Sequence, residues 1–256
     1  MNRVEAMIQS KGRKPLIGVA AYTFNSAFVE MAGLLGFDII WIEMEHAHIA
    51  FSEAADLCRI GAGLGMLTMI RLPDAQRRTV LRAAECGADI LDLPMGSTPE
   101  VVAELVRHAR YYPEGSRGFF GASRGTRYGM FGHIADEQRR VNENICLMAQ
   151  IETAEAAARA EEICSVPGLD AIFVGMGDLS ASMGIPGQIN HPDVRGTTDR
   201  VIEVAKAHGK LVGMPGLATD FADWAAKGVD MLFCGSDISC MRTSLQTLLK
   251  QVAGEA

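Results

Sequence analysis

Three features are missing from this sequence of 256 residues: a long apolar run, a basic cluster and closely paired cysteines. No run of about 18 uncharged apolar residues occurs, and the N-terminal segment lacks the apolar core of a signal peptide. We therefore expect a soluble, cytoplasmic protein with no membrane partner. Acidic residues (31) outnumber lysine and arginine (24), which gives a formal charge of −7, and no basic run exceeds Arg139-Arg140. This balance argues against nucleic-acid binding and favours a small-molecule partner.

The six cysteines are spread along the chain without a C-x-x-C pair, and most of them lie in apolar segments. Such spacing is typical of buried thiols in a reducing compartment. We assign no chemistry to Cys58, Cys86, Cys146, Cys164, Cys234 and Cys240.

Short apolar runs alternate with segments of helical spacing along the whole chain. Eight runs predict strands at residues 15–21, 38–44, 67–71, 89–94, 145–152, 171–175, 210–214 and 230–235. Stretches rich in alanine, leucine, glutamate and arginine predict helices at residues 51–62, 75–86, 99–111, 153–164, 193–208 and 221–227. The order is strand then helix, repeated.

Eight such units in about 250 residues fit a (β/α)8 TIM barrel better than an open doubly wound sheet. Four segments, L-L-G-F-D, E-C-G-A-D, V-P-G-L-D and A-K-G-V-D, each place a glycine where a helix ends and an aspartate where the next strand begins. No internal boundary is visible, so we expect a single domain over residues 1–256.

Catalytic groups in such barrels lie at the C-terminal ends of the strands. Here the second strand runs into a cluster of acids and histidines, and four other strands also end in charge. The residues are Glu43, Glu45, His46, Arg71, Glu152, Asp178 and Asp237, the last of which we expect to cap the final helix. Five charged strand ends at one rim predict an active site there.

About fifty residues connect the fourth and fifth strands, and a loop this long is more often functional than idle. Its segment 114–129 contains several glycines and the arginines Arg117, Arg124 and Arg127. These residues suit an anion such as a carboxylate or phosphate, although the segment lacks the order of a P-loop.

Glu152 and Asp178 offer oxygen ligands, which favour a hard divalent ion such as Mg²⁺ or Mn²⁺. Two carboxylates leave coordination positions open for a chelating substrate such as a 2-oxo acid. Arg71 suits a keto oxygen that gains enolate charge, and His46 suits a base near neutral pH. No lysine ends a predicted strand, since Lys210 begins one, so a Schiff-base aldolase is disfavoured.

Residues 150–184 carry the strongest motif, Q-I-E-T followed by G-x-x-D-L-S at a defined spacing. On this motif, and on I-R-L-P and E-H-A earlier in the chain, the sequence resembles the metal-dependent (class II) pyruvate aldolases of the HpcH/HpaI family. The resemblance extends over nearly the whole chain. It implies aldol chemistry on a 4-hydroxy-2-oxo acid with a pyruvate enolate and an aldehyde partner.

The resemblance also implies roles for individual residues. Glu152 and Asp178 would ligate the ion, which is Mg²⁺ or Mn²⁺ with Co²⁺ as a further option. Arg71 would meet the keto oxygen, and His46 would be the base, acting through a metal-bound water. The remaining implied residues are Glu85 as partner of that histidine, Gln150, Gly175, Met176 and Gly177 in the pyruvate pocket, and Arg127 facing the aldehyde. A homo-oligomer, a hexamer or trimer of dimers, would exchange C-terminal helices at about 238–252.

Several positions depart from the family pattern. Glu43 and Glu85 stand where an aspartate is usual, His48 stands where a proline is usual, and Met176-Gly177 replaces a segment with proline. These departures leave two alternatives open. One is another lyase or decarboxylase that uses the same enolate, such as a citryl- or malyl-CoA lyase, and the other is a non-catalytic barrel that binds a small acid.

Overall fold

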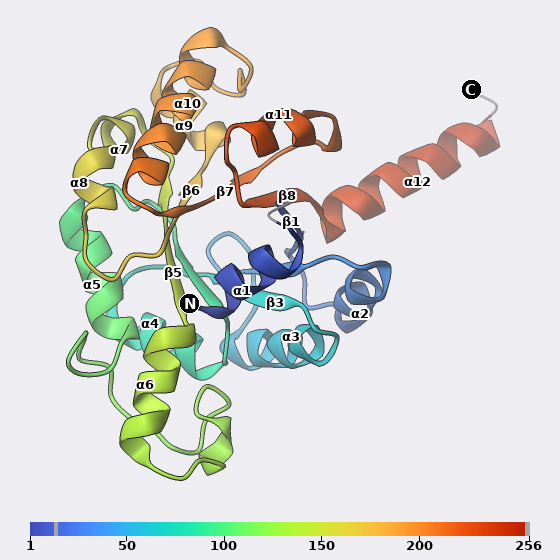
Figure 1. The fold of residues 1–256 in the computed structure, drawn as a ribbon. Helices are drawn as coiled ribbons and strands as arrows, with labels where there is room; N and C mark the ends of the chain where they lie inside the picture. The colour runs from blue at the N-terminus through green and yellow to red at the C-terminus, as the bar shows by residue number, and fades with distance from the viewer. Residues whose placement is uncertain (13–14, 254–256) are drawn as a thin grey trace.

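Eight parallel strands close into a barrel in the computed structural model, which describes residues 1–12 and 15–253 (Figure 1). Each strand pairs with its neighbours in chain order, and the last pairs with the first. The predicted TIM barrel and all eight predicted strands are thus confirmed. The strands are β1 (Leu16–Ala21), β2 (Ile39–Glu43), β3 (Leu67–Arg71), β4 (Ile90–Leu93), β5 (Cys146–Ile151), β6 (Ala171–Val174), β7 (Leu211–Pro215) and β8 (Met231–Ser236).

Helices surround this barrel on its sides and at one end, and the last helix extends away from it (Figure 1). They are α1 (Arg3–Ser10), α2 (Ser26–Leu35), α3 (Phe51–Gly63), α4 (Arg77–Glu85), α5 (Pro99–Ala109), α6 (Ile134–Asn144), α7 (Ala154–Ala158), α8 (Ala160–Cys164), α9 (Met176–Ser182), α10 (Pro192–Ala207), α11 (Phe221–Ala226) and α12 (Asp237–Ala253). Residues 13–14 and 254–256 of the predicted domain lie outside the described residues.

Five of the six predicted internal helices are confirmed, and the predicted helix at 153–164 is two short helices, α7 and α8, that meet at Arg159. Helices α1, α2, α6 and α9 were not predicted. Helix α2 has apolar residues on several sides and a glycine inside, so no single apolar face marks it. Helix α6 lies within the long connection that the sequence predicted as loop.

The strands are apolar on both faces because each strand serves two parts of the core. The ring of Trp41 on β2 lies 5.2 Å from the rings of Phe173 on β6 and Phe233 on β8, so these aromatic side chains fill the barrel interior. Gly18 on β1 makes room for them, since a Cβ there would lie 2.4 Å from the Phe233 ring. The side chains that alternate with these along the strands, such as Ile40 and Ile42, point outward. They pack in a separate apolar cluster between the strands and the helices.

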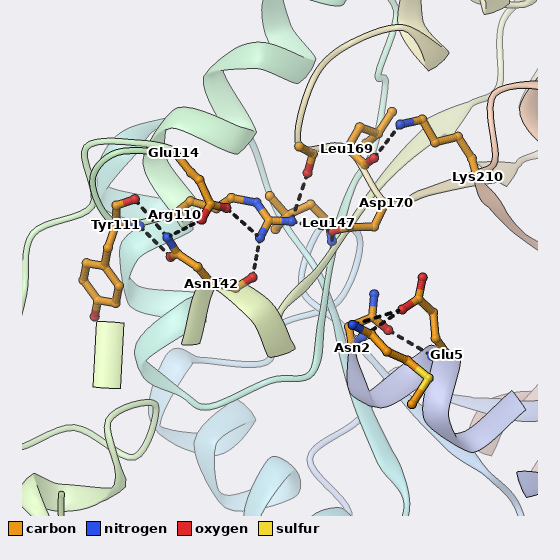
Figure 2. Close-up of polar contacts among 12 residues, drawn as sticks. Asn2, Glu5, Arg110, Tyr111, Glu114, Asn142, Leu147, Leu169, Asp170 and Lys210 are labelled. Atoms are coloured by element: carbon orange, nitrogen blue, oxygen red, sulfur yellow. Dashed lines mark hydrogen bonds and ion pairs between the residues drawn. The ribbon is translucent and has the colours of Figure 1, made fainter. Parts of the chain in front are cut away.

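The four glycine–aspartate segments have a shared structural role. All four glycines have a positive φ between 75° and 92°: Gly36, Gly87 and Gly228 lie at the C-terminal ends of helices, and Gly168 lies in the turn that follows α8. Each following aspartate accepts a hydrogen bond from a backbone N–H of the preceding strand, at 2.8 to 2.9 Å. Figure 2 shows one example, in which Asp170 accepts from Leu147 and also pairs with Arg110. The segments therefore fasten neighbouring strands in pairs at their N-terminal ends.

Helix α1 covers this N-terminal end of the barrel. Asn2 and Glu5 form a capping box that fixes its first turn (Figure 2). Val4 and Ile8 are buried with the interior residues of the strands. The C-terminal ends of the strands form the opposite rim, where charged residues gather.

Helix α12 extends away from the barrel (Figure 1). Its apolar side chains are exposed, namely Ile238, Met241, Leu245, Leu248, Leu249 and Val252. In the part of the chain that the structure describes, no helix combines the length and the apolar character needed to cross a membrane.

Candidate active site

Polar side chains replace apolar ones where β2 to β5 end. Glu43, Arg71 and Asp92 are register partners on three adjacent strands, and Gln150 follows on β5. All four side chains are buried. Because burying so many polar groups costs free energy, their gathering at the catalytic rim of a barrel indicates a functional site.

Arg71 is the centre of this group. Its Nη1 lies 3.2 Å from Glu43 Oε2, and its Nη2 lies 2.6 Å from Glu45 Oε2 and 3.6 Å from Glu152 Oε2. Burial lowers the pKa of Arg71, but the surrounding carboxylates more than offset this and raise it above its ordinary value. The Nε atom is buried without a hydrogen-bond partner. Arg71 is thus a cation whose position is fixed by ion pairs and whose Nε–H is free to donate a hydrogen bond.

Glu43 ends the strand and turns the chain. Its Oε1 accepts hydrogen bonds from the backbone N–H groups of Glu45 (2.7 Å) and His46 (3.1 Å). Strand alternation would have put Glu45 and His46 on opposite faces, but this turn brings them together beside Arg71. The His46 Nε2 atom lies 3.4 Å from Glu45 Oε2, and the imidazole is 63% exposed, so it remains open to a substrate.

Glu152 follows β5 and is fixed by the loop after β4. Its Oε1 accepts a hydrogen bond of 2.7 Å from the backbone N–H of Met95, whose φ of 49° is unusual for a residue other than glycine. Gly175 leaves room for it, because a Cβ there would lie 2.8 Å from Glu152 Oε2. The protein therefore accepts a strained backbone to position this carboxylate.

Asp178 lies in the first turn of α9, with its side chain exposed near Glu152 and Glu45. Burial is the main cause that raises the pKa of Glu152, and the negative charges of Asp178 and Glu45 raise it further. Burial likewise raises the pKa of Glu45, with smaller contributions from Glu43 and Asp178. Acidic groups thus exceed the cationic charge that Arg71 supplies.

A hard divalent cation fits this excess of carboxylate oxygens. Within residues 1–12 and 15–253, no three His, Cys, Asp or Glu side chains are arranged so that they could hold a metal ion. Glu152 and Asp178, the ligands that the sequence predicts, lie among the acidic groups of this rim, together with Glu45. A site with two protein ligands leaves coordination positions for other oxygen donors.

Asp92 is a site residue that sequence reasoning missed. Its side chain is completely buried, and its Oδ2 accepts a hydrogen bond from Gln150 Nε2, while its Oδ1 has no partner. Burial raises the pKa of Asp92 well above its ordinary value. The second aspartate of D-I-L-D-L was a usable signal, since it occupies an interior position in line with Ile90.

The predicted pyruvate-pocket residues lie where two strands end, with Gln150 at the end of β5 and residues 175–177 directly after β6. Gln150 is held by Asp92, and Gly175 lies against Glu152, as described above. Met176 is 3% exposed and packs in the core beneath the helices, so its side chain does not face the rim. Gly177 is exposed, and a Cβ there would meet no atom within 4 Å.

Two predicted residues lie away from His46. Glu85 is at the end of α4, which runs back toward the N-terminal end of the barrel, and it pairs with Arg117 at 2.8 Å. Arg127 pairs with Glu137 of α6 and lines a cavity near the starts of β4 and β5. A single chain therefore does not bring Glu85 to His46 or Arg127 to the rim, and both roles stay predictions. Glu85 lies far from the rim because α4 runs away from it. Arg127 lies far from the rim because the long connection folds back toward the N-terminal end of the barrel.

Asp237 lies at the start of α12, as predicted, and its carboxylate accepts a hydrogen bond of 2.8 Å from the backbone N–H of Ile238 in the first turn. The same carboxylate accepts hydrogen bonds from the backbone N–H groups of Tyr22 (3.0 Å) and Thr23 (2.9 Å). It therefore also holds the loop after β1, which the sequence did not predict. This loop lies beside the acidic group, since burial and the charge of Glu43 raise the pKa of Tyr22.

Comparisons with known proteins agree with this architecture. Residues 17–241 match the HpcH/HpaI aldolase/citrate lyase family. The chain is 36% identical to a hydroxypyruvate/pyruvate aldolase of Sagittula stellata over 216 residues, 84% of this chain and 81% of that protein. It is 31% identical to a 5-keto-4-deoxy-D-glucarate aldolase of Escherichia coli O157:H7 over 248 residues, 96% of this chain and 95% of that protein.

A solved structure gives the same result at the level of the fold. The crystal structure of an HpcH/HpaI aldolase from Desulfitobacterium hafniense DCB-2 matches with a TM-score of 0.90 at 28% identity, over 96% of this chain and 95% of that chain. The family match covers most of the sequence, including every rim residue described above. The chain therefore belongs to the HpcH/HpaI aldolase/citrate lyase family.

Proposed function

We propose that this chain is a metal-dependent pyruvate aldolase, which cleaves or forms a 4-hydroxy-2-oxo acid through the enolate of pyruvate, with an aldehyde as the second product or substrate. One observation carries the proposal: the buried guanidinium of Arg71 lies between the carboxylate of Glu152 and the Glu45–His46 pair. A guanidinium, carboxylates suited to a divalent ion and an imidazole suited to proton transfer thus lie at one rim. The aldolase relatives support the same reaction class.

The carboxylates of Glu152 and Asp178 would hold the divalent ion, which is Mg²⁺, Mn²⁺ or Co²⁺. When bound, this ion supplies a Lewis acid for the oxygens of the 2-oxo acid. Glu152 is suited to the task because the Met95 N–H occupies only its Oε1 atom, while Oε2 faces Arg71 at 3.6 Å.

Arg71 would stabilise the keto oxygen as negative charge develops on it. Its ion pairs with Glu43 and Glu45 fix the guanidinium before substrate arrives, so little reorganisation is needed during the reaction. Its unpartnered Nε is a donor that protein atoms leave free. The Gln150 amide, oriented by Asp92, and the backbone at Gly175, which lies against Glu152, would line the pyruvate end beside it.

His46 would move the proton. In the cleavage direction, a base removes the proton from the 4-hydroxyl group, and an acid later returns a proton to C3 of the enolate. The imidazole is exposed on the solvent side of the rim, and Glu45 lies at 3.4 Å to orient it. We assign no part of this step to Glu85, which lies at the other end of the barrel.

We also propose that the protein is a homo-oligomer in which α12 packs on a second copy, as in the exchanged helix of the predicted hexamer or trimer of dimers. The exposed leucines of α12, Leu245, Leu248 and Leu249, are 56% to 71% exposed. Burying them against another chain would remove a large apolar area from water.

The test uses protein stripped with EDTA and then incubated with a panel of 4-hydroxy-2-oxo acids, with and without Mg²⁺ or Mn²⁺. Pyruvate release is followed through lactate dehydrogenase. We expect release that depends on the added ion and is lost in Glu152→Ala and Asp178→Ala. Separate arms with oxaloacetate and with citryl- or malyl-CoA detect the alternative lyases. Release without metal, or binding without turnover in every arm, would contradict the proposal.

A further inference from the structure

A second cavity lies at the opposite end of the barrel from the proposed active site. Its volume is about 440 Å³, and it is lined by residues at the end of α4, on α6 and in the loop that precedes α6. Gly87, Ala88 and Asp89 just before β4, and Asn144 and Ile145 just before β5, line it. Since the strands run from this end toward the rim, the cavity is separate from Glu152 and Asp178.

Arginines dominate the cavity wall. Five of them line it, namely Arg3, Arg117, Arg124, Arg127 and Arg140. Three carboxylates pair with these arginines: Asp89 with Arg3, Glu85 with Arg117, and Glu137 with both Arg127 and Arg140. Five guanidinium groups against three carboxylates leave an excess of two positive charges, in a chain whose net charge is −7.

Arg117 and Arg124 have donors that the protein does not use. The Arg117 side chain is fully buried and stacks over the Tyr111 ring at 4.7 Å, and its Nη2 pairs with Glu85. Its Nε and Nη1 atoms have no partner, and neither has Arg124 Nε. Buried N–H groups without an acceptor are rare in native proteins, which indicates that something else accepts from them.

The local backbone is shaped around Arg124. Gly87 has a φ of 75°, and a Cβ there would lie 2.8 Å from Arg124 Cγ. Gly125 allows the loop to lie against α4, because a Cβ there would be 2.6 Å from the carbonyl oxygen of Ala84. Two glycines thus let the arginine-bearing loop approach the helix closely.

We propose that this cavity is a second binding site, which takes a small, doubly charged oxyanion such as a phosphate group or a dicarboxylate. The planar guanidinium forks match the oxygens of both groups, and the excess of two positive charges matches a dianion. The site does not depend on the proposed aldolase reaction or on its metal.

The test is calorimetric titration of the EDTA-stripped protein with inorganic phosphate and, separately, with malonate, and a second series in which the protein is loaded with Mg²⁺ and saturated with pyruvate. We expect at least one of the two anions to bind, and its affinity to be unchanged by pyruvate. The anion that binds more tightly, phosphate or malonate, identifies the ligand class. Arg124→Gln should weaken binding about tenfold or more, the value of a lost charged hydrogen bond.

Arg139→Gln is the matched control, because Arg139 is the neighbour of Arg140 on α6 but is exposed and pairs only with Asp136. It should bind like the unaltered protein. Arg124→Lys, which keeps the charge and loses the fork, replaces Arg124→Gln if that variant does not fold, and should bind more weakly than the unaltered protein. Lack of binding by either anion, displacement by pyruvate, or unchanged affinity in the Arg124 variant that folds would overturn the proposal.

Discussion

The carboxylate of Glu45 lies 2.6 Å from the Nη2 atom of Arg71. The same carboxylate oxygen lies 3.4 Å from the imidazole of His46, so one side chain joins the guanidinium to the proposed base. The junction exists because Glu43 accepts from two backbone N–H groups and ends the strand. The departure from the family's usual aspartate at position 43 thus lies in the residue that shapes the turn.

Replacement of Glu45 by glutamine tests this junction. The amide removes the charge that orients His46, while Arg71 keeps its ion pair with Glu43. We expect deuterium exchange at C3 of pyruvate to slow by about 10- to 100-fold, less than a complete loss of the base would cause. The exchange is followed by NMR in D₂O with added Mn²⁺-free Mg²⁺. Glu53→Gln is the control, since Glu53 lies on α3 and caps its first turn; equal exchange rates in Glu45→Gln and the unaltered protein would contradict the role.

A second prediction concerns the pH dependence of stability. Burial raises the folded-state pKa of Asp92 well above 3.8, so folding favours its protonated form. Its contribution is therefore fully present below pH 3.8 and is lost as the pH rises through the folded-state value. At neutral pH, Asp92→Asn should raise the free energy of unfolding by about 1 to 3 kcal/mol, because the neutral amide avoids the cost of burying a carboxyl group that tends to ionise as the pH rises.

The measurement is urea denaturation of the metal-free protein between pH 5 and 8, with Asp92→Asn beside the unaltered chain. The difference between the two should grow with rising pH. The asparagine oxygen can still accept from Gln150, so the amide keeps its orientation. A difference that stays constant over this range, or that shrinks, would show that Asp92 is ionised as readily in the folded chain as in the unfolded one.

Gly175 and Gly177 offer a matched pair for the metal ligand. A Cβ at Gly175 would lie 2.7 Å from Glu152 Cβ, whereas a Cβ at Gly177 would meet nothing within 4 Å. Gly175→Ala should displace Glu152 and weaken Mn²⁺ binding by about 10- to 100-fold, as changes around metal ligands commonly do. Gly177→Ala should leave Mn²⁺ affinity unchanged and stabilise α9 by about 0.5 to 1 kcal/mol. Calorimetry gives both affinities, and equal values for the two variants would remove Glu152 from the ligand set.

Much of the fold could be predicted because its signals are local. A run such as D-I-I-W-I is apolar on both faces, and the glycine–aspartate segments mark each junction between a helix and an even-numbered strand. The positions of Arg71 and Glu152 also followed from the strands, since a residue at the end of a barrel strand must lie at the rim.

The positions of the other site residues depend on contacts that cannot be predicted from the alternation of side chains along a strand. The turn at Glu43 comes from hydrogen bonds between a side chain and the backbone, so Glu45 and His46 could not be placed by counting residues. The positions of Arg127 and Glu85 within the chain could not be predicted for a related reason. The long connection folds back along α4 to the N-terminal end of the barrel, where Arg117 pairs with Glu85.

The last prediction concerns the exposed face of α12. If a second copy covers Leu245 and Leu249, light scattering should give a mass that is a multiple of 27.5 kDa. Leu245→Glu combined with Leu249→Glu should then produce a smaller species, because charged groups cannot be buried there without a partner. Circular dichroism should remain that of the unaltered protein, since neither leucine packs in the barrel core. Substitution of the polar neighbours Gln246 and Thr247 by glutamate is the control for added charge, and a mass of 27.5 kDa for the unaltered chain would refute the role of α12.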